Sequence, residues 1–226
     1  MKQEFDIFEI EYTESDLEYI DDLIKYFKNN YKTIMNFFHL KEFTKKVKIK
    51  FWNSKEEYRD YFNKIYKEKG YHRTVSEWEV GRSFTEECPK IFLMSYKERV
   101  KCRGHEKDTL DSLFKVIVHE FVHTCQFEYN HHTESLTWFL EALATNLSCQ
   151  YDGLSLGLNA TLDDIINGQV SYSNYYTMGK YLLESYPKEY ILELAKNKDL
   201  LLKDTKKIYE ETLEYIKKDR INQRKS

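Results

Sequence analysis

The chain has 226 residues and a formal net charge of −3, with 41% hydrophobic and 32% charged residues. This length and apolar content suit one domain with a core of its own. The slightly acidic balance argues against nucleic acid or an anionic membrane as a partner. No apolar run approaches the roughly 20 residues of a membrane span, and residues 1–12 lack the apolar stretch of a signal peptide. We therefore expect a cytoplasmic protein with no nucleic-acid or membrane partner.

The first half of the chain predicts strands alternating with helices. The expected strands are residues 5–12, 47–52, 81–84 and 90–96, the last two joined by a tight turn at 86–89. Capping-box pairs at Ser15/Glu18 and Ser54/Glu57 predict the starts of two helices, which continue to about Phe38 and Lys67.

The second half of the chain is expected to be mostly helical. With Asp108 as its N-cap, one helix should run to about Phe127, and its apolar residues lie nearly all round, as in a helix buried between layers. Further helices are expected over residues 135–149 and from Tyr176 through Leu183. The fold class predicted is α+β, a small N-terminal mixed sheet with helices followed by a mostly helical C-terminal lobe. We expect one domain over residues 1–226, with sub-lobes of about 1–128 and 129–226.

The buried helix contains the sequence His119-Glu120-Phe121-Val122-His123. Residues four apart share one helix face, so both imidazoles can bind one Zn²⁺ while Glu120 takes a proton from the attacking water. Polar groups in an apolar helix need partners, and a metal ion satisfies all three at once. Two hydrogen-bonded core histidines are the alternative interpretation.

A catalytic zinc site needs a third protein ligand. Glu141 is the candidate, because it stands alone as an acid in the sequence Trp138-Phe139-Leu140-Glu141-Ala142-Leu143-Ala144-Thr145. The small residues after it let two helices approach closely enough for a carboxylate to reach a metal on the other. A surface position for Glu141 is the alternative.

The remaining metal-binding residue types are expected to play no part in the site. Cys88, Cys102, Cys125 and Cys149 form no CxxC pair, which is typical of reduced thiols. Cys125 follows His123 by two positions and so falls off the metal-facing side of the helix. His131 and His132 could line the cleft, but we expect them to be solvated.

HEFVH, followed 18 positions later by the Glu of W-x-x-E-A-x-A, resembles the gluzincin metallopeptidases. The order of elements resembles the peptidase MA-like domain over most of the chain. This resemblance implies a zincin-like fold, with the active-site helix between the two lobes. Tyr176-Thr177-Met178-Gly179-Lys180 is similar to the Y-x-x-G segment of these enzymes, which implies that Tyr176 stabilises the oxyanion; Tyr175 and Tyr172 are alternatives.

Related patterns differ from this one. The metzincin pattern would need Gly and His where the chain has Gln126 and Tyr129, and the inverted H-x-x-E-H order is absent. The strand 90–96 takes the place of the edge strand against which a peptide substrate would pair. It carries no acid until Glu98, although Glu86 and Glu87 precede it, and no G-x-M-x-N-like stretch is found. An aminopeptidase specificity is therefore not indicated.

The expected function is a zinc metallopeptidase with one Zn²⁺ per chain, held by His119, His123 and Glu141, with Glu120 as general base and Tyr176 at the oxyanion. Its substrate would be a peptide or protein segment. Two alternatives stay open from the sequence. One is a zinc-containing module that binds a peptide or protein without turnover, and the other is a hydrolase of a non-peptide amide.

Overall fold

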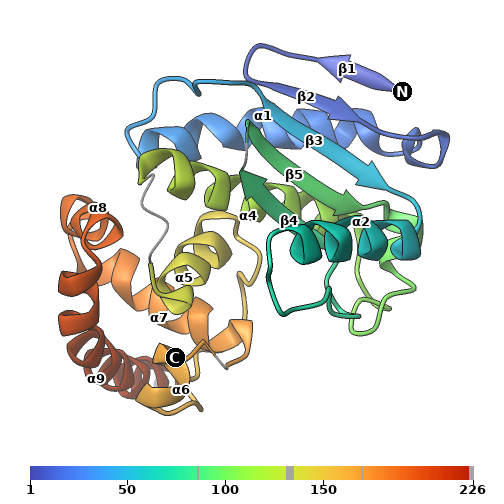
Figure 1. Cartoon of the computed structure of the whole chain (residues 1–226). Coiled ribbons are helices and arrows are strands. Elements are labelled where there is room, and N and C mark those ends of the chain that lie inside the picture. Colours follow the sequence, from blue (N-terminus) through green and yellow to red (C-terminus); the bar gives the residue numbers. More distant parts are fainter. Residues whose placement is uncertain (86, 131–134, 169, 224–226) are drawn as a thin grey trace. The chain divides into compact units, whose positions relative to one another are not determined.

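The computed structural model describes residues 1–85, 87–130, 135–168 and 170–223. The chain divides into two compact units. The first unit is formed by residues 1–36 and 40–124, and the second by residues 37–39 and 125–226. The structure is α+β, with its sheet in the first unit and helices in both (Figure 1). The expectation of a single domain stays a prediction.

The first unit contains a five-stranded mixed sheet of order β1-β2-β3-β5-β4. Its strands are β1 (Lys2–Glu4), β2 (Phe8–Glu11), β3 (Val47–Trp52), β4 (Gly81–Thr85) and β5 (Pro89–Met94). The three inner strands are parallel, and β1 and β4 are antiparallel to their neighbours. The strand at 47–52 is confirmed, whereas the expected strand 5–12 is shorter and a separate strand precedes it.

The expectation that residues 90–96 form the edge strand is wrong. β5 ends at Met94, and it lies between β3 and β4, so that β4 occupies the edge. The physical reason is visible in the sequence, because Ile91, Phe92, Leu93 and Met94 form a continuous apolar run, and all four are buried. A strand buried on both faces belongs inside a sheet, while the more polar β4 tolerates an edge.

The helices of the first unit are α1 (Ile20–Phe37, whose last residue belongs to the second unit), α2 (Lys55–Glu68), α3 (Tyr96–Arg99) and the part of α4 (Leu110–Tyr129) that ends at Thr124. The Ser54 cap is confirmed, since its side chain accepts a hydrogen bond from the Glu57 backbone N–H. The capping box expected at Ser15 is wrong, because Thr13 and Asp16 form it instead and cap the 3₁₀ turn Glu14–Asp16.

The N-cap expected at Asp108 is also wrong. The side chain of Thr109 accepts the bond from the Ser112 backbone N–H at 3.2 Å. The Asp108 carboxylate instead accepts a hydrogen bond from Arg99 Nε and lies 2.7 Å from His105 Nδ1, so it does not cap the helix.

Helices cover both faces of the sheet in the first unit (Figure 1). On one face, Phe62 of α2 packs on Phe92 of β5 with ring centroids 5.1 Å apart. On the other face, Phe27 of α1 contacts Phe8 of β2 and Phe121 of α4, at 4.9 and 5.0 Å. The helix that carries the candidate site is therefore one wall of this aromatic core.

The second unit contains the last residues of α4 and five further helices among the described residues. They are α5 (Thr137–Leu147), α6 (Leu162–Ile166), α7 (Tyr172–Ser185), α8 (Lys188–Lys196) and α9 (Lys198–Gln223). None of the described helices combines the length and apolar character needed to cross a membrane.

Candidate metal and catalytic site

The His119-Glu120-Phe121-Val122-His123 sequence lies in the middle of α4, as expected. Its apolar neighbours are fully buried, and they include Ile117, Val118, Phe121 and Val122. His119 is only 5% exposed and Glu120 8%. The helix thus places an imidazole and a carboxylate where their desolvation must be offset by a partner.

The two histidines converge on one point. Their Nε2 atoms lie 3.1 Å apart, and their ring planes are nearly perpendicular. Zn–N bonds of about 2.0–2.1 Å in a tetrahedral site would hold two nitrogens about 3.3 Å apart. The spacing of the two imidazoles therefore fits a shared metal ion with little adjustment.

Gly81 allows the edge strand to approach Glu120. A Cβ atom on Gly81 would lie 3.1 Å from Val116 Cγ1 and 3.2 Å from both Glu120 Oε1 and Leu93 Cδ2. Any larger residue would press on the carboxylate and on the core beneath it. Gly81 was not expected at the site from the sequence, although a glycine in a strand often marks a close approach of another group.

In the second unit, α5 is anchored to the end of α4 next to Glu141. The buried Gln126 side chain donates from Nε2 to the backbone carbonyl of Leu140 at 3.0 Å. Gln126 follows His123 by three residues on the same continuous helix. From the sequence, Gln126 is only a departure from the metzincin pattern, and its structural role could not be predicted.

Among the described residues, His119 and His123 of the first unit and Glu141 of the second are a group that could hold a metal ion. Glu141 is half-buried rather than on the surface. The two histidines and one carboxylate are a donor set found in catalytic zinc sites. By contrast, Cys125 is buried and burial raises the pKa of its thiol well above the usual value, which disfavours a thiolate ligand.

The candidate tyrosines lie on α7, which packs directly on α5. A Cβ on Gly179 would lie only 2.3 Å from the Ala142 carbonyl oxygen, so the two backbones are in contact at this glycine. Asn146 of α5 reinforces the contact by donating from Nδ2 to the Tyr176 carbonyl at 3.0 Å.

The pKa values of the adjacent tyrosines Tyr175 and Tyr176 are raised by different neighbouring charges. Burial, followed by the negative charge of Glu141, raises the pKa of Tyr175. For Tyr176, burial and then the charge of Asp152 raise the pKa. Tyr172 stacks on Tyr151 at 6.5 Å between ring centroids. Between Tyr175 and Tyr176, the charge of Glu141 contributes to the raised pKa of Tyr175.

Several residues considered from the sequence take no part in the described site. Glu87 is exposed, and Glu98 pairs with Lys101. Glu86, His131 and His132 lie outside the described residues. Cys88, Cys102 and Cys125 are buried thiols, and Cys149 is exposed.

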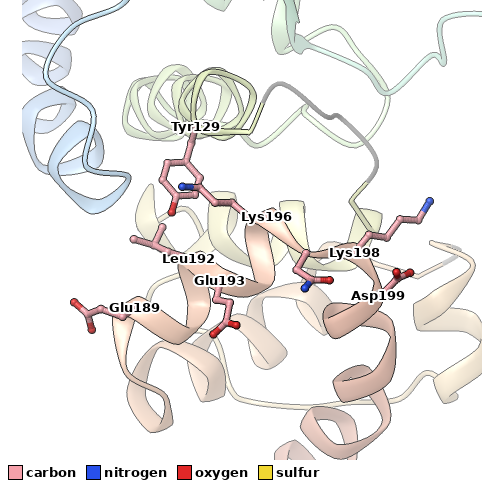
Figure 2. Close-up of a pocket in the computed structure, with 8 residues that line it drawn as sticks. Tyr129, Glu189, Leu192, Glu193, Lys196, Lys198 and Asp199 are labelled. Carbon is pink, nitrogen blue, oxygen red and sulfur yellow. The ribbon is translucent and has the colours of Figure 1, made fainter.

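A separate hollow on the second unit is lined by residues of α4, α8 and α9 (Figure 2). Two of the lining residues are in contact, since the Lys196 ammonium lies 4.2 Å from the centre of the Tyr129 ring. Its charges are mixed, with Glu189, Glu193 and Asp199 beside Lys196 and Lys198. This arrangement offers no convergent set of donors and does not include the candidate ligands.

Compared with protein-family models, with curated proteins and with solved structures, the chain matches none.

Proposed function

We propose that the protein is a zinc-dependent metallopeptidase in which His119, His123 and Glu141 hold one Zn²⁺ per chain. The observation that carries the proposal is the convergence of the His119 and His123 Nε2 atoms, 3.1 Å apart, on the helix that also holds the buried Glu120. A zincin-like fold is part of the proposal, as is a cytoplasmic location without nucleic-acid or membrane partners. The donor set and its partly enclosed surroundings support zinc better than calcium or magnesium, which prefer all-oxygen sites.

Glu120 is proposed as the general base. It directly follows His119 on α4, and its Oε1 atom would lie 3.2 Å from a Cβ atom on Gly81, the first residue of β4. Its carboxylate would accept a proton from the attacking water and return it to the leaving amine. A zinc ion at the site would supply Lewis acidity to the scissile carbonyl and lower the pKa of a water molecule.

A phenol is proposed to stabilise the oxyanion. The sequence pattern assigns this role to Tyr176. The electrostatic link to Glu141 supports Tyr175, so we assign the role to Tyr175 and keep Tyr176 as the alternative. Either hydroxyl would donate a hydrogen bond to the charge that develops on the carbonyl oxygen.

The substrate is proposed to be a peptide or protein segment bound in extended form along β4. The Met94 N–H donates to the Val80 carbonyl at 2.9 Å. Hydrogen bonds alternate along antiparallel strands, so the backbone groups of Gly81, Ser83 and Thr85 face away from β5. An extended peptide can pair with these groups, and the strand begins beside the Glu120 carboxylate.

The test is the Glu120→Gln variant on a fluorogenic peptide library. The amide keeps the shape of the side chain but cannot accept the proton, so turnover should fall by about 10²–10⁴-fold while bound zinc is retained. Glu128→Gln, the same exchange two turns further along α4, is the control and should keep its activity.

Hydrolysis by Glu120→Gln at the wild-type rate would refute the mechanism. A wild-type protein that binds zinc and peptides without cleaving them would instead be the binding module named above. Cleavage restricted to non-peptide amides would identify the other alternative.

A further inference from the structure

We propose that His105 is a positioning residue that ties the start of the edge strand β4 to the start of α4 and so holds the peptide-binding edge in register with Glu120. This inference rests on the proposed function for its substrate, but the link itself is a feature of the first unit alone. It involves residues well separated from the candidate metal ligands in sequence.

Both nitrogens of the His105 ring are engaged. Nδ1 lies 2.7 Å from Asp108 Oδ2, and Nε2 lies 2.9 Å from the Trp78 carbonyl oxygen. A carbonyl oxygen only accepts, and so does a carboxylate. The imidazolium form, which donates from both nitrogens, joins these two acceptors as a two-ended bridge, whereas a neutral ring donates to only one of them.

The end of the bridge at Asp108 is fixed. The Asp108 carboxylate also accepts from Arg99 Nε at 2.6 Å and forms an ion pair with Nη2 at 2.5 Å. Arg99 is only 2% exposed, and Tyr96 donates from its hydroxyl to the Asp108 backbone carbonyl at 3.1 Å. The next residue, Thr109, caps α4. This end thus moves only with the helix that carries Glu120.

The other end enters β4 through a short segment that is also held. The Glu79 side chain accepts from the Tyr58 hydroxyl and from Arg82 Nε, both at 2.8 Å. Lys55 donates to the Glu79 backbone carbonyl. Gly81, beside Glu120 Oε1, is three residues after Trp78, so the His105 contact lies at most about 11 Å of chain from it.

The bridge should therefore matter for long substrates. A peptide that pairs with the outward-facing backbone groups of β4 is placed correctly for cleavage only if the strand keeps its position relative to Glu120. Without His105, the Trp78 carbonyl loses its partner and the strand start can shift. A substrate too short to reach β4 would not depend on this alignment.

The first arm of the test needs no activity. Backbone hydrogen exchange is measured by mass spectrometry for wild type, His105→Ala, His105→Gln and His72→Ala. His72 is an exposed histidine between α2 and β4, in the segment that also contains Trp78, and serves as the control. We expect exchange over β4 to be about tenfold faster in His105→Ala, as for loss of a charge-assisted hydrogen bond. His105→Gln, which keeps one donor, should be intermediate, and His72→Ala unchanged.

The second arm compares a ten-residue peptide substrate with a blocked dipeptide amide. For His105→Ala we expect KM for the long peptide to rise about tenfold with little change in kcat, and the rate on the short substrate to stay at the wild-type value. A merely structural role would lower both rates together.

Exchange over β4 equal to that of His72→Ala, or faster exchange spread evenly over the first unit, would overturn the inference. If His105→Ala does not fold, His105→Gln decides by the same criteria. If the wild-type protein cleaves no peptide, the proposed function fails, and the exchange arm alone still decides whether His105 positions β4.

Discussion

Neighbouring tyrosines on a helix point in directions about 100° apart, so a shift of one residue changes which phenol faces a site. Tyr175 and Tyr176 illustrate this. The Y-x-x-G pattern contains Gly179, and the structure shows this glycine to be the point where α7 meets α5. It leaves open which preceding tyrosine faces Glu141, because that depends on how α7 is rotated against α5. The histidine pair is different, since its four-residue spacing alone fixes a common face.

The tyrosine assignment gives a prediction at this scale. Tyr175→Phe removes the proposed oxyanion donor and should lower kcat by about 10²-fold, while zinc content stays the same. Tyr176→Phe is the matched exchange and should lower kcat severalfold at most. Both variants are compared by steady-state kinetics on the best library peptide. The opposite order would return the role to Tyr176, and two unaffected variants would remove it from both.

At the scale of elements, α5 and α7 pack backbone against backbone at Gly179, and the Asn146 side chain donates to the backbone of both helices there. From the sequence, the small residues after Glu141 were expected to allow a close approach to the helix of the two histidines, whereas the close contact at Gly179 is made with α7. Other elements were harder to predict. β1 is only Lys-Gln-Glu and has no apolar pattern, and the order of β4 and β5 follows from burial on both faces rather than from chain order.

Gly179→Ala tests this contact. The added methyl would lie 2.3 Å from both the Ala142 carbonyl oxygen and Asn146 Nδ2, so α7 must move away from α5. We expect a loss of about 3 kcal/mol in the free energy of unfolding, measured in urea, together with weaker zinc binding because Glu141 lies on α5.

Gly157→Ala is the control, because its Cβ would meet no atom within 4 Å. It should change neither property. Wild-type stability in Gly179→Ala would mean that the helices are not packed as closely as described.

At the scale of the whole molecule, the α+β class could be predicted because strand patterns fill the first half of the chain and helical patterns the second. The boundary between the two units was harder to predict from the sequence. The first unit ends at Thr124 within α4, whereas the sequence suggested a break after the helix. A helix that is apolar all round gives no sign of where one core ends and the next begins. The polar bridge through His105 and Asp108 could not be predicted from the sequence either, because it joins loops whose paths are determined by the fold.

The central claim is that α4 and α5 together hold one zinc ion. The most direct measurement is elemental analysis of protein reconstituted with zinc and then desalted, for wild type, Glu141→Ala and the exposed-site control Glu189→Ala. We predict about one zinc per chain in wild type and control, and a sharp loss in Glu141→Ala. No zinc in the wild type would contradict the account and leave a buried histidine pair held by hydrogen bonds. Full zinc content in Glu141→Ala would remove Glu141 from the ligands.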